Sequence, residues 1–310
     1  MARRATAVSL ACLLAAGLAP PLRPGTAMAA GCARHAPGAH EGFRVPHARR
    51  APDAPRTPGP RSPKPDDVAK VKDELGRRLA GITPPTEFTV STRVHVITKG
   101  ARQVTDRAVV AQINALNAAY GGQYGGVDTG VRFRLDSISV KENGSWFTDP
   151  VGNEKVMKRT LHEGGAGTLN LYIAQLSELM LGFSSYPYWY ADAPALDGVV
   201  IDWRSLPGGA LTNYNRGFTG VHEIGHWLGL FHTFENGCAQ PGDGIDDTPA
   251  EARPTEACPE GKDTCAENPG LDPTRNFMDY AHDRCMAEFT KGQAERMHEM
   301  WAAYRDTSDA

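Results

Sequence analysis

The run from His222 to His232 constrains this chain more than any other part of its sequence, because it reads H-E-x-x-H-x-x-G-x-x-H. On a helix, His222 and His226 lie four residues apart and point the same way, which places two imidazoles within reach of one tetrahedral metal ion. Gly229 permits the left-handed turn that ends such a helix and returns His232 as third ligand. Glu223 lies beside the ligands, where it can take a proton from a water molecule. The pattern predicts a hydrolytic zinc centre.

A second motif lies downstream, where residues 276–280 read N-F-M-D-Y. A lone methionine usually fills a core, and a short H-E-x-x-H can occur by chance in an amphipathic helix. The extended zinc motif followed by x-Met-x-Tyr instead favours a Met-turn. We expect Met278 to form an apolar floor beneath the metal, and the turn to carry Tyr280 toward it.

From His222 to Met300 the chain resembles the pappalysin (cytophagalysin-type) metzincins. The resemblance implies an α+β metzincin fold, α/β-like in its upper part, with a twisted mixed sheet, an active-site helix, a Met-turn and a C-terminal helix. It also implies a secreted zinc endopeptidase with one catalytic Zn²⁺ that acts on proteins or peptides, with Glu223 as general base and Tyr280 as a hydrogen-bond donor to the oxyanion. The segments that carry the resemblance are His222–Phe234, Gly242–Pro249, Asn276–Tyr280, Cys285–Met286 and Phe289–Thr290.

Hydrophobic periodicity places the elements around the motif. Alternating apolar residues predict half-buried strands near 131–135 and 169–173. Residues 93–97 are strand-like, and residues 198–202 form the approach to the motif. Helical spacing predicts helices near 66–82 and 109–120, the second capped by Thr105 and stopped by Gly121. Thr290 and Gln293 form a capping box for a last helix whose Met297, Met300, Trp301 and Tyr304 point inward.

The N-terminal part of the chain divides by composition. In residues 1–29, Arg3 and Arg4 precede an apolar run too short to span a bilayer, and a small-x-small site follows, which is typical of a secretory signal. Residues 30–65 are rich in proline and arginine without periodicity, which predicts a disordered propeptide or spacer. The catalytic domain is expected over residues 66–310.

Cys32 is left over once Cys12 is removed with the signal. Three readings stay open for it: a latency switch whose thiolate occupies the zinc, a lipid anchor at a weak lipobox, or an incidental residue. Four further cysteines, without any C-x-x-C pair, predict two disulfides in a secreted domain, and three pairings are possible. The family resemblance implies Cys238–Cys265 and Cys258–Cys285.

An acidic stretch follows the third histidine. Carboxylates crowded together repel one another unless a cation gathers them, although a solvated loop is the ordinary alternative. The resemblance implies structural Ca²⁺ there, held by Asp243, Asp246, Asp247 and Thr248.

The segment after the Met-turn is expected to wall the pocket just beyond the cut. The pocket candidates are Asp279, Asp283 and Arg284. Relatives with an acidic pocket prefer a basic residue after the cut, and Arg284 argues against that preference here. The formal net charge of −3 gives no indication of a nucleic-acid partner, and we expect a monomer without a transmembrane segment. Two rival functions are a zinc amidase and a binding protein that has lost activity.

Overall fold

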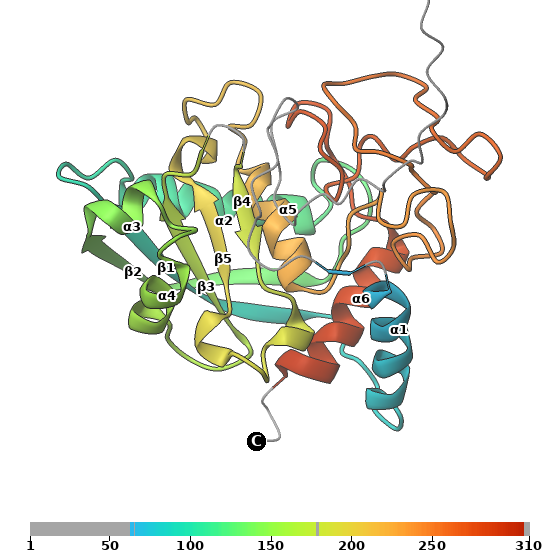
Figure 1. Ribbon diagram of the computed structural model, residues 1–310, viewed down its shortest axis with the longest axis horizontal. Coiled ribbons are helices and arrows are strands. Elements are labelled where there is room, and N and C mark those ends of the chain that lie inside the picture. The colour runs from blue at the N-terminus through green and yellow to red at the C-terminus, as the bar shows by residue number, and fades with distance from the viewer. Residues whose placement is uncertain (1–62, 65, 178–179, 307–310) are drawn as a thin grey trace, which may run out of the picture. The chain divides into compact units, whose positions relative to one another are not determined.

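The computed structural model describes residues 63–64, 66–177 and 180–306. The expected signal, most of the expected propeptide and Cys32 lie outside the described residues. Along the chain the elements are α1 (Asp67–Arg78), β1 (Phe88–Thr98), α2 (Asp106–Tyr120), β2 (Val131–Glu142), α3 (Gly144–Thr148), α4 (Glu154–Leu161), β3 (Thr168–Ala174), β4 (Gly182–Ser184), η1 (Pro187–Trp189), η2 (Pro194–Leu196), β5 (Val199–Asp202), η3 (Trp203–Ser205), α5 (Phe218–Trp227), α6 (Lys291–Met300) and η4 (Trp301–Arg305) (Figure 1).

The five strands form one mixed sheet in the order β2-β1-β3-β5-β4. The pairs β1–β2, β1–β3 and β3–β5 are parallel, whereas β4 runs antiparallel to β5 at the edge. The helix α5 contacts β4, β5 and α2 (Figure 1). The zinc-motif helix therefore borders both β5 and the short antiparallel edge strand β4.

Local sequence explains the two helices that frame this layer. The side chain of Thr105 accepts a hydrogen bond from the backbone of Ala108 at 3.2 Å and caps α2, which ends before Gly121 as expected. The predicted capping box is present at α6, where Thr290 and Gln293 each bond the other's backbone. Both helices thus begin at the residues that the sequence indicates.

The helix α1 packs beside α6. Its apolar face consists of Val68, Val71 and Leu75, which are buried against a cluster containing Phe231 and Met300. Arg78 at its end lies over the ring of Tyr304, 4.4 Å from the ring centroid. A helix was expected near residues 66–82, and α1 is that helix.

One strand differs from its expected environment. Residues 169–173 were expected to be half-buried, but β3 is the central strand and all of its residues after Thr168 are buried. The polar side chain of Asn170 survives there because its amide bonds the backbone of Glu163 and the ring of His95. Both faces of β3 are covered, because Leu169, Leu171 and Ile173 belong to one hydrophobic cluster and Tyr172 and Ala174 belong to another.

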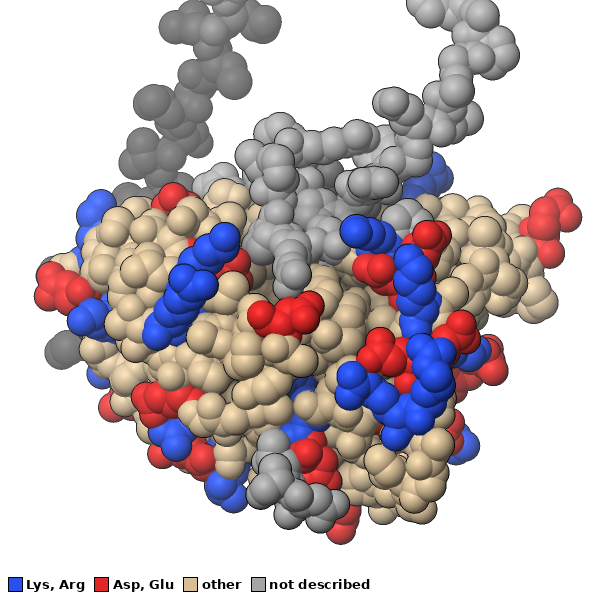
Figure 2. Space-filling model, turned by 60° about the horizontal axis from the view of Figure 1, so that its bottom comes forward, with Lys and Arg blue, Asp and Glu red and all other residues tan. Residues whose placement is uncertain are grey.

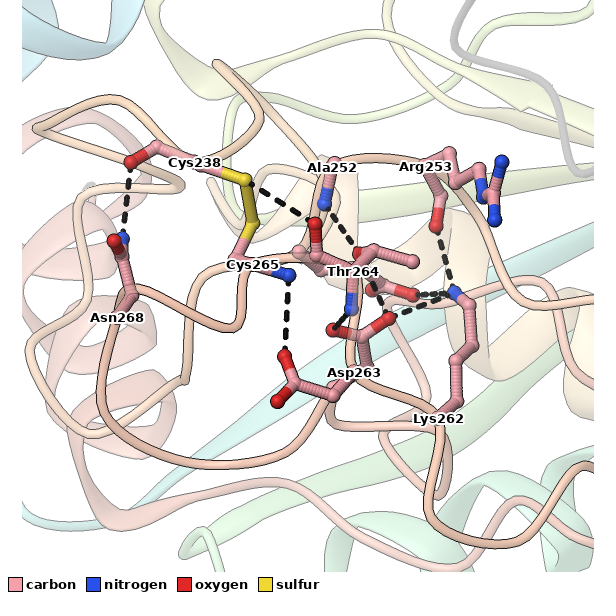
Figure 3. Close-up of a disulfide and its surroundings, with 10 residues drawn as sticks. Cys238, Ala252, Arg253, Lys262, Asp263, Thr264, Cys265 and Asn268 are labelled. Carbon is pink, nitrogen blue, oxygen red and sulfur yellow. Dashed lines mark hydrogen bonds and ion pairs between the residues drawn. A yellow bond between two sulfur atoms is a disulfide. The ribbon is translucent and has the colours of Figure 1, made fainter.

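The long segment between α5 and α6 contains no helix or strand, only an isolated bridge. Two disulfides hold it, Cys238–Cys265 and Cys258–Cys285, with Cα–Cα separations of 5.5 and 5.8 Å. This is the pairing that the resemblance implies. Figure 3 shows the first of them, beside which the amide of Asn268 donates to the carbonyl of Cys238 at 3.0 Å.

The surface carries no strong bias of charge on the face shown in Figure 2, where acidic and basic side chains are interspersed. Within the described ranges, no helix has the length and apolar character that crossing a membrane requires.

Candidate active site

The helix α5 supplies two of the three histidines. All of its residues are buried, and it enters from Gly217, whose φ of +83° favours glycine. At the other end Gly229 has φ +94°, and the backbone of Leu230 bonds back to the carbonyl of Gly225 at 2.9 Å. The predicted left-handed turn is therefore present, and it returns the chain toward the helix with His232 at its end.

The three imidazoles converge on one point. His226 Nε2 lies 3.2 Å from His222 Nε2 and 3.1 Å from His232 Nε2. Two ligands of a tetrahedral zinc ion at about 2.0 to 2.1 Å lie about 3.3 Å from each other. Among the described residues, these three histidines are the only group of three or more His, Cys, Asp or Glu side chains that converges in this way.

The hydrogen bonds of the Nδ1 atoms determine which ring nitrogens are free to bind a metal ion. Nδ1 of His222 donates to the carbonyl of Phe277 at 2.7 Å, and Nδ1 of His226 donates to that of Leu230 at 2.7 Å. A carbonyl only accepts, so the protons lie on Nδ1 and the Nε2 lone pairs face one another. Burial holds the pKa of His226 well below its ordinary value and lowers that of His232 to about 3. Neutral imidazoles with converging lone pairs fit Zn²⁺.

Further side chains orient the ligands from outside. The hydroxyl of Tyr186 lies 3.0 Å from Nδ1 of His226, and the carboxylate of Glu235 lies 3.6 Å from Nδ1 of His232. The ring of Phe234 stacks on His232 with centroids 4.6 Å apart and planes 12° from parallel. Sequence reasoning did not assign roles to these three residues, because none belongs to the histidine spacing itself.

The Met-turn lies where the motif predicts. Met278 is fully buried against Gly225, where a Cβ atom would collide with the thioether sulfur. A glycine at this position of α5 therefore allows the methionine to approach the helix between the two histidines. The hydroxyl of Tyr280 lies 3.1 Å from His232 Nε2, so it reaches the metal position.

Glu223 is fully buried and borders the edge strand. A Cβ atom on Gly182 of β4 would lie 2.6 Å from Cγ of Glu223 and 2.9 Å from its Oε1. The strand thus approaches the glutamate through a residue without a side chain. Nothing in the three-residue strand sequence Gly-Phe-Ser had indicated this contact.

The acidic loop does not gather its three carboxylates. Asp243 is buried and accepts from the hydroxyl of Thr248 and the backbone of Ile245. Asp247 instead accepts from residues at the start of α6, and the Asp246 side chain is exposed and 3.9 Å from Lys72. Of the four candidate calcium ligands, Asp243 and Thr248 are hydrogen-bonded to each other and Asp246 lines the same pocket, whereas Asp247 faces α6.

The three pocket candidates differ in exposure. Asp279 is fully buried and accepts from the backbone amides of Thr255 at 2.8 Å and Tyr280 at 2.7 Å. Asp283 is 1% exposed and accepts from the backbone of Arg216 at 2.8 Å. Arg284 is exposed. Asp279 therefore braces the Met-turn from within.

A histidine triad on a helix and glycine turn, a methionine floor beneath it and a mixed sheet with one antiparallel edge strand together define a metzincin-type zinc metalloprotease. Comparisons with known proteins agree. The model of the peptidase M43 family, described as pregnancy-associated plasma protein-A, matches residues 168–302.

Curated relatives cover most of this chain. An extracellular metalloprotease of Neurospora crassa is 42% identical over 210 residues, which are 65% of this chain and 69% of the relative. One from Verticillium alfalfae is 41% identical over 228 residues, 71% of this chain and 80% of the relative. The chain belongs to the pappalysin (M43) family, and it is an extracellular zinc metalloendopeptidase with His222, His226 and His232 as its metal site and Glu223 beside it.

Solved structures of mirolysin from Tannerella forsythia share this fold. A mutant promirolysin superposes with a TM-score of 0.67 at 24% identity, covering 78% of this chain and 90% of that chain. Mature mirolysin in complex with a cleaved peptide gives a TM-score of 0.62 at 28% identity, covering 73% and 94%. The expected fold class is confirmed.

Proposed function

We propose that Glu223 is the general base of peptide hydrolysis and that Tyr280 stabilises the oxyanion. The support for this is that Glu223 directly follows the ligand His222 on α5 and that the Tyr280 hydroxyl lies 3.1 Å from His232 Nε2. When bound, zinc supplies Lewis-acid polarisation of the scissile carbonyl and lowers the pKa of water to about 7. Glu223 accepts the proton of the attacking water and delivers it to the leaving amine.

Tyr280 contributes at the carbonyl oxygen. Its phenol donates a hydrogen bond to the oxygen that gains negative charge as the carbonyl is attacked. Its ring is held by Phe234, with centroids 5.0 Å apart, and by its own backbone bond to Asp279. The group is therefore oriented before substrate arrives.

The test is Glu223→Gln in zinc-loaded mature protein. The amide preserves shape but accepts no proton, so turnover of a quenched peptide is expected to fall by about 10²-fold or more, with zinc content unchanged. Tyr280→Phe should lower kcat by about ten- to a hundredfold and leave KM within about threefold, because the hydrogen bond forms in the transition state. Near-parent kcat in Glu223→Gln with bound zinc would contradict the general-base role.

We also infer that substrate lies extended along β4 and that Asp283 selects the residue after the cut. β4 is an edge strand, which offers backbone pairing to a peptide. Asp283 is buried, whereas Arg284 is exposed and so leaves the pocket's charge to Asp283. This supports a preference for Lys or Arg after the cut, in spite of the doubt that Arg284 raises from sequence.

A peptide library measures this preference directly. Asp283→Asn is expected to reduce cleavage before Lys and Arg by at least about tenfold relative to cleavage before Leu. Arg284→Gln is the matched control and should leave the ratio unchanged. An unchanged ratio in Asp283→Asn, or a shift only in the control, would reject Asp283 as the selector.

We further propose one calcium site centred on Asp243. The hydroxyl oxygen of Thr248 lies 2.7 and 2.8 Å from the two oxygens of Asp243 and 2.9 Å from the carbonyl oxygen of Ile245. One hydroxyl proton cannot serve three acceptors at once, and burial raises the pKa of Asp243 to about 7. A hard cation bound to these oxygens would relieve both problems.

Melting temperature with and without Ca²⁺ tests the site. A ligand that binds only the folded protein stabilises it by about 2.7 kcal/mol at a hundred times its Kd. Asp243→Asn should abolish the calcium-dependent increase, whereas Asp246→Asn, which removes an exposed carboxylate of the same loop, should retain it. A parent melting temperature that does not respond to calcium, with none bound by elemental analysis, would leave the loop as a solvated turn.

A further inference from the structure

A network of buried charges lies outside the zinc site, in the disulfide-bonded segment. Lys262 Nζ lies 2.5 Å from Glu251 Oε1 and 3.1 Å from Asp272 Oδ2. It also donates to the carbonyl of Arg253 at 2.7 Å and to Thr255 Oγ1 at 3.0 Å. The Lys262 side chain is 14% exposed, and both carboxylates are fully buried.

The network reaches the Met-turn through Asp279. Thr255, whose hydroxyl bonds Lys262 and Glu251, donates its backbone N–H to Asp279 Oδ1 at 2.8 Å. The same carboxylate oxygen accepts the backbone N–H of Tyr280 at 2.7 Å. Its other oxygen, Oδ2, is buried without a hydrogen-bond partner among the described residues. Only one oxygen of the Asp279 carboxylate, the one that accepts from the Tyr280 backbone, therefore has hydrogen-bond donors among the described residues.

The network also reaches the third zinc ligand. Glu251 Oε2 accepts the hydroxyl proton of Thr233 at 2.7 Å, and Thr233 directly follows His232. The backbone N–H of Thr233 donates to the carbonyl of Met278 at 3.3 Å. Glu251 therefore fixes the ligand segment on one side while Asp279 fixes the tyrosine on the other.

We propose that Lys262 is a positioning residue for catalysis, which holds the Met-turn and Tyr280 against the third zinc ligand by balancing the buried carboxylates of Glu251 and Asp279. The inference rests on the proposed role of Tyr280. It also gives the disulfides a specific purpose, because Cys258 and Cys265 flank the short loop that carries Lys262.

The buried carboxylates of Glu251 and Asp279 need the positive charge of Lys262 for an electrostatic reason. A buried carboxylate that loses its counter-ion is strongly destabilised, so it is protonated or draws water into the network. Either change weakens the hydrogen bonds that Glu251 and Asp279 accept from Thr233, Thr255 and Tyr280. A displacement of about 1 Å in a group that acts on the transition state can cost about 10²-fold in rate.

The experiment compares Lys262→Met, Lys262→Arg and Lys155→Met in the full mature enzyme with zinc content verified. Lys155 is an exposed lysine of α4 and serves as control. We expect Lys262→Met to lower kcat by about ten- to a hundredfold with KM within about twofold, Lys262→Arg to recover most of the loss, and the control to match the parent. A purely structural role would instead lower the fraction of active enzyme.

A double-mutant cycle tests the path. If Lys262 acts through Tyr280, then Lys262→Met should cost at least about fivefold less in the Tyr280→Phe background than in the parent. Equal losses in both backgrounds, or a zinc-loaded Lys262→Met with parent kcat, would overturn the proposal. Should Lys262→Met fail to fold, Thr255→Val removes the hydroxyl link alone, and the same cycle applies to it.

Zinc release into a chelator separates this proposal from the proposed function. If Tyr280→Phe has parent kcat, the oxyanion role fails, but Lys262→Met should still release zinc at least about fivefold faster than Lys155→Met, because the His232 segment has lost its brace. Equal release rates together with equal kcat would overturn the role of Lys262 whatever Tyr280 does.

Discussion

Arg305 lies outside the zinc site, and we expect its loss to lower the stability of the fold strongly. It is fully buried in η4 and forms a two-pronged pair with Asp197 at 3.1 and 3.2 Å. It also donates to the carbonyl of Trp227 at 2.8 Å and to that of Ala166 at 2.9 Å, and its guanidinium lies 3.5 Å from the Trp227 ring centroid. Trp227 is the last residue of α5.

Replacing Arg305 with Met keeps the volume and removes the charge. Asp197 then retains bonds from Ser185 and Trp227 but no counter-ion, which for a buried pair costs about 3 to 5 kcal/mol. At about 2 to 4 °C per kcal/mol for a domain of this size, the melting temperature should fall by about 6 to 20 °C. Burial opposes ionisation of Asp197, but Arg305 and the hydrogen bonds lower its pKa below the ordinary value.

The assay is urea unfolding at fixed zinc, with Asp197→Asn and the double variant beside Arg305→Met. The double variant should recover part of the loss, because no unpaired charge remains. A lowered carboxyl pKa stabilises the fold above the unfolded pKa of about 3.9, and this is lost as pH falls through the folded value. The stability advantage of the parent over Asp197→Asn should therefore shrink below about pH 4. A loss of under about 1 kcal/mol in Arg305→Met would refute the reasoning.

Three further outcomes are expected. Gly182→Ala should lower kcat by about tenfold or more with zinc retained, because the new Cβ displaces Glu223, and parent activity would show that β4 yields instead. Gly229→Ala should weaken zinc binding in equilibrium dialysis, since the residue has φ +94° and faces Met300; unchanged binding would contradict this. Cys32→Ala in the uncleaved proenzyme should raise peptide hydrolysis if Cys32 is a latency switch, and equal latency or a lipid found by mass spectrometry would reject the switch.

The zinc site was predictable because its determinants are local. His222 and His226 are fixed by helical spacing, and a single glycine turn returns His232, so no long-range contact has to be known. The same holds for the caps of α2 and α6. Burial was harder to predict than element type, as in β3, whose alternating pattern gives no sign that both of its faces are covered.

Long-range pairings were beyond the sequence. Arg305 meets Asp197 across 108 residues, and no local pattern marks either residue as a partner. In the acidic loop, nearness in sequence suggested that the carboxylates share one cation. Instead, Asp247 accepts a hydrogen bond from Thr290 at the start of α6, whereas Asp243 is buried and accepts one from Thr248. The sequence around Lys262 does not distinguish it from a surface lysine, and only the fold shows that it contacts buried carboxylates.

The two disulfides overlap along the chain, since Cys258 lies inside the loop closed by Cys238 and Cys265, and Cys265 lies inside the loop closed by Cys258 and Cys285. A single cut at any peptide bond from 238 to 285 therefore leaves both fragments covalently joined. Irregular segments of this kind are preferred sites of proteolysis. Other molecules of the same protease can cleave them. A nicked molecule would keep Lys262, the Met-turn and the third histidine on one connected body, so self-digestion there need not release them.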